Sequence, residues 1–275
     1  PLSHALEQFV GLFTVLNFGA TIFYLTRVNP VVIARALRTY RITHMITVPQ
    51  LLKAMWDTIE FKAEAEGKLK LLRVMLSVSG ILPFWARRLM FRQIHSSLGG
   101  RLCMFGCAGA PLDTYIAKNW EKIGVVVIEG YGTTETSAGV AANTLKHRCL
   151  GSVGRIMDGV DVKFTDEGEI LTRGPNLSRG YFKNPKKTRE MFTADGYFKT
   201  GDVGYIGRGG YVFLSGRKKF KIVTASGEKV YPEDRERVLE AWARTVAHPE
   251  PLHLEFRLVR PDGATPWVLG LVTPE

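Results

Sequence analysis

A loop rich in glycine and hydroxyl side chains, "EGYGTTETSAG" at residues 129–139, directly follows the apolar run "VVVI" at residues 125–128. The apolar run predicts a buried strand, and ligand-binding loops of open α/β sheets follow the carboxyl ends of such strands. Glycines let the backbone approach a ligand and expose amide donors. Threonine hydroxyls donate to phosphate oxygens, a carboxylate such as Glu135 holds Mg²⁺, and Tyr131 offers a flat face to a base. The pattern favours a nucleotide site, although a glycine-rich turn with a capping threonine has the same composition.

Three other short segments carry residues that suit the same ligand. The loop "CAGAPLD" at residues 107–113 is built mostly from small residues, so a planar ring can lie against its backbone. In "YFKTGDVG", Asp202 lies in a glycine turn, where its carboxylate can accept from two ribose hydroxyls. In "LSGRKKFKIV", Arg217 lies at a turn and can donate to an anion or a ribose. Each segment alone is equally compatible with turn chemistry or solvated surface charge.

In this order, the segments resemble the adenylate-forming superfamily, in particular the fatty acyl-CoA synthetases. "EGYGTTETSAG" is similar to the nucleotide signature of that family, and "CAGAPLD" is similar to its adenine-side loop. "GEILTRGPNLSRGYFKNP", "GYFKTGDVGYI" and "GRKKFKIVTASGEKVYP" resemble its later core motifs. "PLSH" at residues 1–4 resembles a segment whose histidine faces the acyl and ATP sites. The resemblance runs from residue 1 to about residue 235.

The resemblance implies roles for individual residues. Thr134 would contact the α-phosphate, Glu135 would hold Mg²⁺, and His4 would lie near the acyl group, so these three form the expected catalytic set. Tyr131 would stack on adenine, and Lys219 would lie at the hinge about which a C-terminal domain swings. The complete nucleotide-binding set that the resemblance implies is Gly109, Ala110, Gly130, Tyr131, Gly132, Thr133, Thr134, Asp202 and Arg217.

The reaction that the resemblance implies has two steps. A carboxylate attacks the α-phosphate of ATP, which gives an acyl-adenylate and pyrophosphate, and the thiol of CoA then displaces AMP. Crowded phosphate charge must be neutralised, and Mg²⁺ with backbone or hydroxyl donors can supply this. The expected cofactors are therefore ATP, Mg²⁺ and CoA, and the expected substrate is a fatty acid or another carboxylate.

Strands and helices alternate over the first 150 residues, which predicts an α/β fold with a mostly parallel sheet covered by helices. Asn29 as N-cap and Pro30 at the first helical position predict one helix, and "PFWARRLMFRQIHSSLGG" predicts another that ends at Gly99. The most apolar stretch, residues 9–25, favours a buried helix running into a buried strand over a membrane span. The strands expected besides residues 125–128 are 18–25, 43–49, 71–80 and one directly before "CAGAPLD".

The pattern changes near Gly151, where short alternating strands and glycine turns predict an antiparallel, barrel-like subdomain. In the tail, a charged helix precedes two β-runs joined by a turn at residues 261–263. The hairpin "EFRLVRPDG" followed by "WVLG" resembles the later half of a PAS sensor domain, with a divergent synthetase C-terminal domain as the alternative. We expect an α/β part of an AMP-binding domain at 1–150, a β-rich subdomain at 151–215, the hinge and start of a C-terminal domain at 216–235, and a short α+β tail at 236–275.

The net charge of +11, from 37 basic and 26 acidic residues, favours anionic partners such as nucleotides, CoA or phospholipid surfaces. The basic residues are spread along the chain, so we expect no nucleic-acid partner. Cys103, Cys107 and Cys149 form no CxxC pair, which predicts reduced cytosolic thiols and no zinc site. No signal peptide is recognised before Pro1. We therefore expect a cytoplasmic protein and leave open a peripheral contact with the inner face of the membrane.

Two segments that the resemblance implies are not found in these 275 residues. One is a Ser/Thr/Gly-rich phosphate loop with its lysine. The other is a late catalytic lysine near a Gly-Lys pair after Pro232; the only Gly-Lys pair, Gly67-Lys68, lies far upstream. We therefore expect a segment truncated at both ends, which is poorly active as a ligase by itself. The alternative is a catalytically incomplete AMP-binding or sensory module that uses its PAS-like tail for signalling.

Overall fold

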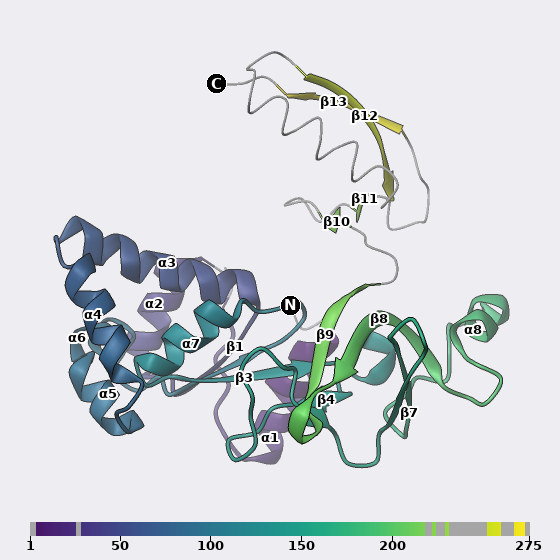
Figure 1. Ribbon diagram of the computed structural model, residues 1–275, viewed down its shortest axis with the longest axis horizontal. Helices are drawn as coiled ribbons and strands as arrows, with labels where there is room; N and C mark the ends of the chain where they lie inside the picture. Colours follow the sequence, from purple (N-terminus) through teal and green to yellow (C-terminus); the bar gives the residue numbers. More distant parts are fainter. Residues whose placement is uncertain are drawn as a thin grey trace. The chain divides into compact units, whose positions relative to one another are not determined.

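The computed structural model describes residues 4–25 and 29–217, together with four strands at 222–223, 229–230, 252–259 and 267–272. The chain divides into two compact units, Pro1–Ser215 and Gly216–Glu275. The first unit contains two sheets and all the helices described, and the described strands of the second unit form a third sheet (Figure 1). None of the described helices combines the length and the hydropathy needed to cross a membrane.

A five-stranded sheet of order β1-β2-β3-β4-β5 forms the centre of the first unit. Its strands are β1 (His44–Thr47), β2 (Met104–Cys107), β3 (Val126–Tyr131), β4 (Ala141–Ala142) and β5 (Arg155–Ile156). The first three strands run parallel, and the last two continue the sheet antiparallel. β3 changes its partner midway, because Glu129 is the last residue opposite β2 and Gly130 is the first opposite β4.

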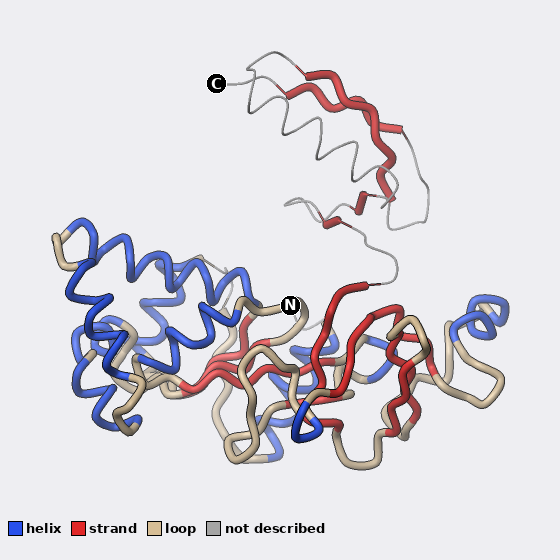
Figure 2. Tube along the Cα trace, in the orientation of Figure 1, coloured by secondary structure: helices blue, strands red, loops and turns tan. Residues whose placement is uncertain are grey.

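Helices gather around the parallel part of this sheet, at one end of the first unit (Figure 2). Their bounds are α2 (Pro30–Thr39), α3 (Pro49–Ala65), α4 (Leu69–Ser79), α5 (Phe84–Met90), α6 (Arg92–Ser97) and α7 (Thr114–Lys122). The core between helices and sheet contains three fully buried aromatic residues, Trp56, Phe105 and Trp120. Trp120 packs edge-on against both of the others, with ring centroids 5.6 Å from Trp56 and 4.8 Å from Phe105.

The predicted start signals are confirmed. The side chain of Asn29 accepts a hydrogen bond from the backbone amide of Val32 at 2.8 Å, and Pro30 begins α2. Asp113 caps α7 in the same way, by accepting from the amide of Tyr115 at 2.8 Å. The predicted strands at 43–49, before "CAGAPLD" and at 125–128 correspond to β1, β2 and β3.

One predicted strand and one predicted helix differ in the structure. Residues 71–80 were expected to be a strand but lie in and just after α4, because the buried Leu72, Leu76 and Ser79 recur at helical rather than alternating spacing. The helix expected to run to Gly99 is interrupted at Phe91 and forms α5 and α6.

The apolar stretch at residues 9–25 is only partly as predicted. It contains the π-helical segment η1 (Glu7–Thr14) and the short helix α1 (Val15–Asn17), but residues 18–25 form a turn and an irregular connection. No strand pairs with residues 18–25 in the described part of the chain, so their apolar side chains alone do not make them a strand. Burial was also wrongly predicted, since Phe9 and Phe13 are exposed.

After Gly151 the chain forms a four-stranded sheet, in the order β6-β7-β8-β9. Its elements are β6 (Asp161–Phe164), β7 (Glu169–Arg173), α8 (Pro185–Met191), β8 (Phe198–Ile206), the 3₁₀ turn η3 (Arg208–Gly210) and β9 (Val212–Arg217). The β6–β7 and β7–β8 pairs are antiparallel, as predicted. The apolar cluster of this sheet includes Tyr131 and Val140 beside Ile170 and Val212. β3 and the chain directly after it therefore support both cores of the first unit.

The second unit contains a sheet in the order β10-β11-β12-β13, with β10 (Ile222–Val223), β11 (Lys229–Val230), β12 (Leu252–Val259) and β13 (Trp267–Val272). All three neighbouring pairs are antiparallel. The two β-runs predicted in the tail are confirmed as β12 and β13, with Leu252 opposite Val272. The predicted charged helix and Lys219 lie outside the described residues.

Candidate active site

The loop after β3 folds tightly around the 3₁₀ turn η2 (Thr134–Thr136). The backbone amide of Thr133 donates to Thr136 Oγ1 at 2.8 Å, and this hydroxyl donates to the Thr133 carbonyl at 3.1 Å. Ser137 then adopts a left-handed φ of 50°, which turns the chain back toward β4. Thr136 is buried and used internally, whereas Thr134 is exposed at the tip of the loop. Thr134 is thus the threonine that the loop exposes.

Two features hold this loop in shape. Gly132 allows a close backbone approach, because a Cβ at this position would lie 2.2 Å from the carbonyl carbon of Ala138. Asn176 holds the other side, since its Nδ2 donates to the carbonyls of Thr136 and Gly139, and its own carbonyl accepts from Ser137 Oγ at 2.9 Å. The loop is therefore preorganised by contacts that do not involve a ligand.

The carboxylate of Glu135 is partly buried and oriented by Tyr181, whose hydroxyl donates to Glu135 Oε1 at 2.6 Å. Burial alone would raise the pKa of Glu135, but the hydrogen bond from Tyr181 and other donors outweigh burial and lower it. The backbone carbonyl of Glu135 also accepts from the amide of Ser178 at 2.7 Å. Glu135 is therefore anionic at neutral pH and fixed in direction, as a cation ligand requires.

Tyr131 and Asp202 contact each other directly. The Tyr131 hydroxyl donates to Asp202 Oδ2 at 2.8 Å, and both side chains are buried. Asp202 lies in β8, and its backbone amide donates to Thr200 Oγ1 at 3.0 Å. Sequence reasoning assigned both residues to one nucleotide site but did not predict that they contact each other. The structure shows this contact.

A hollow of about 310 Å³ lies beside the exposed end of this loop. Thr134 and Ser137 line one part of it, and the aromatic rings of Phe9 and Phe13 from η1 line another. The remaining lining residues are Ala5 and Gln8. His4 directly precedes this set and is exposed. Hydroxyl donors and apolar rings therefore share one cavity.

The other predicted residues lie at or close to the ends of β2, β3 and β9. Gly109 and Ala110 are exposed in the loop after β2, which runs parallel to β3, so both loops leave the same edge of the sheet. Gly109 has a φ of 91°, a conformation that favours glycine. Gly130 and Gly132 flank Tyr131, and Thr133 follows them. Arg217 ends β9 and is exposed, while Lys219 lies outside the described residues.

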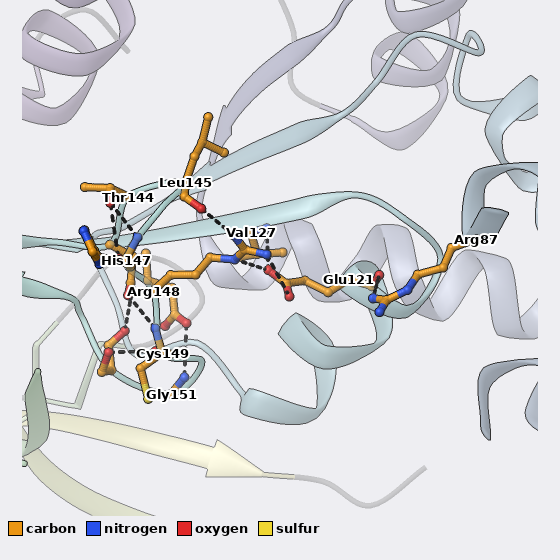
Figure 3. A network of polar contacts seen from close by, with 12 residues as sticks. Arg87, Glu121, Val127, Thr144, Leu145, His147, Arg148, Cys149 and Gly151 are labelled. Carbon is orange, nitrogen blue, oxygen red and sulfur yellow. Dashed lines mark hydrogen bonds and ion pairs between the residues drawn. The ribbon is translucent and has the colours of Figure 1, made fainter. Parts of the chain in front are cut away.

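Sequence reasoning missed a polar network that braces β3 from the side of α7 (Figure 3). Glu121 Oε1 accepts from Arg148 Nε at 2.8 Å and from the amide of Val127 at 3.5 Å. The backbone carbonyl of Glu121 accepts from Arg87 at 3.0 Å. Asn143 continues the support, because its side chain accepts from the amide of Cys149 at 2.9 Å and donates to the Ser152 carbonyl at 2.7 Å. These residues stand apart in the sequence, so no local motif points to the network.

A second missed residue is Glu129, which is buried where β3 changes partners. Burial raises the pKa of Glu129 to about 7, and a 3.4 Å hydrogen bond from the amide of Gly151 offsets this only in part. Glu129 is the opening residue of the quoted loop motif, but its burial could be predicted only from the pairing of β2 with β3. The three cysteines form no disulfide.

The carboxylates of the site suit a metal ion whose shell is completed by a ligand. The described residues contain no group of three or more His, Cys, Asp or Glu side chains that could enclose one. Mg²⁺ is commonly held by one or two carboxylates while phosphates and waters complete its shell. The single oriented carboxylate of Glu135, next to the exposed Thr134, fits that kind of site.

Two family models match different parts of the chain. The model described as AMP-binding enzyme matches residues 1–182, and the model described as PAS fold matches residues 222–274. The PAS match covers all four strands of the third sheet. The resemblances inferred from the motifs and from the tail are both confirmed.

Curated relatives include the long-chain-fatty-acid–CoA ligase FadD15 of Mycobacterium tuberculosis, which is 30% identical over 99% of this chain and 46% of its own length. Long-chain-fatty-acid–CoA ligase 6 of Rattus norvegicus is also 30% identical, over 100% of this chain and 41% of its own length. The chain thus spans less than half the length of these relatives. Among solved structures, ATP-bound MatB from Rhodopseudomonas palustris matches with a TM-score of 0.60 and 26% identity, over 98% of this chain and 47% of that protein.

Proposed function

Because the chain belongs to the family of AMP-binding enzymes, we propose that it carries the nucleotide and acyl sites of an ATP-dependent fatty acid–CoA ligase. The observation that carries this proposal is the hollow shared by Thr134 and Ser137 of the nucleotide loop with Phe9 and Phe13 of η1. An acyl-adenylate joins a phosphate to an alkyl chain. Its binding site therefore needs hydroxyl donors and apolar side chains side by side, which is the combination found here.

The proposed nucleotide contacts follow the loops at one edge of the sheet. Gly109 and Ala110 border the adenine, with Tyr131 on its other side. Asp202 binds the ribose hydroxyls, oriented by the 2.8 Å hydrogen bond from Tyr131 and supported by Arg217. Gly130, Gly132 and Thr133 border the phosphates, and the bare backbone at the two glycines allows a close approach.

The chemical step requires stabilisation of charge at the α-phosphate. In the proposed reaction the substrate carboxylate attacks this phosphorus, pyrophosphate leaves, and the thiol of CoA later displaces AMP from the acyl carbon. The exposed hydroxyl of Thr134 donates to an α-phosphate oxygen, where negative charge accumulates during attack. Glu135 would hold Mg²⁺, and the bound ion would supply neutralisation of the phosphate charge. His4, which directly precedes the lining residue Ala5 in the sequence, lies near the acyl carboxylate in the proposed complex.

An acyl-adenylate analogue with a sulfamate in place of the phosphate tests both halves of the site. In a calorimetric titration, we expect the palmitoyl form to bind roughly tenfold more tightly than the acetyl form, because only the longer chain buries surface against Phe9 and Phe13. Phe13→Ala should remove most of that difference. Phe18→Ala is the matched control, because Phe18 is more exposed than Phe13, at 80% against 60%, and is not among the residues that line the hollow.

The two possible failures have different meanings. Equal affinity for both chain lengths would contradict the acyl site but leave the nucleotide site standing. No binding of either analogue would contradict the nucleotide site as well.

A second candidate function is supported by the PAS fold match at residues 222–274, which no ligase step uses. In this reading the chain is an AMP-binding or sensory module that keeps the nucleotide site and does not turn over substrate. The same titration distinguishes the two readings. Tight AMP binding that the palmitoyl chain does not improve would favour the module over the ligase.

A further inference from the structure

The segment between β7 and α8 packs on the nucleotide loop through Glu135. The backbone amide of Ser178 donates to the Glu135 carbonyl at 2.7 Å, and the Tyr181 hydroxyl donates to Glu135 Oε1 at 2.6 Å. Tyr181 is 46 positions away from Glu135 in the sequence. Two contacts, one to the backbone and one to the side chain, therefore fix this segment against the candidate metal ligand.

Hydrogen bonds from α8 hold Tyr181 from its other side. The amide of Tyr181 donates to Thr188 Oγ1 at 2.9 Å, and this hydroxyl donates to the Asn184 carbonyl at 2.9 Å. Asn184 caps α8 by accepting from the amide of Lys187 at 3.0 Å. The backbone of the first turn of α8, which includes Lys187, therefore has a defined position relative to Tyr181.

The ammonium group of Lys187 lies over the ring of Tyr181, 4.3 Å from its centroid. Its charge acts on the carboxylate beyond that ring. Burial raises the pKa of Glu135, whereas the hydrogen bond from Tyr181 and, more weakly, the charge of Lys187 lower it. Glu135 thus has Thr134 beside it in the loop and a cation across the ring of Tyr181.

No carboxylate pairs with Lys187 in the part of the chain that the structure describes. Lys163 makes the contrast, because its ammonium also lies over a ring, that of Tyr197, but forms an ion pair with Asp195. Lys187 is exposed, so a ligand can reach it. A positioned ammonium without a paired carboxylate, next to a site for a polyanion, is suited to a phosphate oxygen.

We infer that Lys187 contacts the β- or γ-phosphate of bound ATP, and that Tyr181 is the positioning residue for both Lys187 and Glu135. The inference rests on the proposed function, in which Thr134 takes the α-phosphate. ATP has two phosphates more than AMP, and they leave as pyrophosphate in the proposed reaction. A cation placed on them stabilises the charge that the leaving group gains. A contact that only stabilised α8 would not distinguish ATP from AMP.

Equilibrium dialysis against labelled AMP or ATP, with Mg²⁺ present, tests the inference and tolerates weak binding. Lys187→Met should lower ATP affinity about tenfold and change AMP affinity by less than about twofold. Lys187→Arg should keep most of the ATP affinity, because it retains a cation that can donate to phosphate. In a Tyr181→Ala chain, Lys187→Met should have a clearly smaller effect, because the ring under the ammonium is gone.

Lys186→Met is the matched control. Lys186 is the adjacent residue of α8, is also exposed, and carries the same charge. Equal ATP affinities of Lys187→Met and Lys186→Met would overturn the inference, and so would equal losses of AMP and ATP affinity in Lys187→Met. Additive effects of Tyr181→Ala and Lys187→Met would overturn the role of Tyr181. A wild-type chain that binds neither nucleotide would contradict the proposed function itself, because AMP binding does not need Lys187.

Discussion

The Tyr131 hydroxyl donates a 2.8 Å hydrogen bond to Asp202, and this contact joins β3 of the first sheet to β8 of the second. The two residues are 71 positions apart in the sequence. The phosphate-side loop begins immediately after Tyr131. The proposed ribose and phosphate contacts are therefore set by one braced arrangement of two sheets.

Asp202→Ala should weaken AMP binding much more than Asp195→Ala. In the proposed complex Asp202 makes two charge-assisted hydrogen bonds to ribose, each of roughly 1.5–3 kcal/mol before water compensates. Asp195 is a suitable control because it is fully exposed, pairs with Lys163 and accepts from Thr193 at 2.6 Å. Isothermal titration with AMP measures both. Equal losses would remove Asp202 from the nucleotide site.

Glu135→Gln should remove the Mg²⁺ dependence of ATP affinity while leaving Mg²⁺-free AMP binding nearly unchanged. The amide is uncharged and binds the cation poorly, but it can still accept the hydrogen bond from Tyr181. ATP titrations at several Mg²⁺ concentrations provide the readout. Glu190→Gln, at an exposed position of α8, is the control and should behave as wild type. Mg²⁺ dependence that persists in Glu135→Gln would place the ion elsewhere.

Glu129→Gln should stabilise the protein at pH 8 and have little effect at pH 5. The folded-state pKa of Glu129 is raised to about 7 from an ordinary 4.5, so the folded state takes up a proton between these values. Above pH 7 the buried carboxylate is ionised, and its cost to stability is full, on the order of 3 kcal/mol. That cost falls as pH decreases and is gone below about 4.5. Urea unfolding of both proteins at the two pH values measures the difference.

Glu190→Gln, at an exposed position of α8, again serves as the control. A Glu129→Gln variant that is destabilised equally at pH 5 and pH 8 would contradict the raised pKa of Glu129 and the stability cost derived from it.

The chain alone should bind adenine nucleotide weakly and release pyrophosphate slowly when given ATP and fatty acid. These 275 residues contain neither of the lysine-bearing segments that the resemblance implies for handling phosphate charge. Less neutralisation of that charge means a higher barrier for attack at the α-phosphate. A coupled assay of fatty-acid-dependent pyrophosphate release measures this. Robust turnover would show that the residues present suffice.

Much of the site could be predicted because its signals are local. The N-cap Asn29 and the glycine-rich motif around Glu135 depend on neighbouring residues, and the structure bears out the cap. Residues 71–80 were mistaken for a strand because a short apolar run suits a strand or a buried helix equally well. Tyr181 and Arg148 could not be predicted as supports, since each acts on a carboxylate 27 to 46 positions away.

The change of partner within β3 limits how this chain can vary in length. Glu129 and the residues before it are in register with β2, and Gly130 and Tyr131 are in register with β4. Insertion or deletion of one residue there would reverse which side chains face each core, in two ladders at once. The connections at residues 66–68, between α3 and α4, and 165–168, between β6 and β7, carry no such double constraint. Differences in length among homologous chains should therefore fall in those connections, and β3 should remain free of gaps.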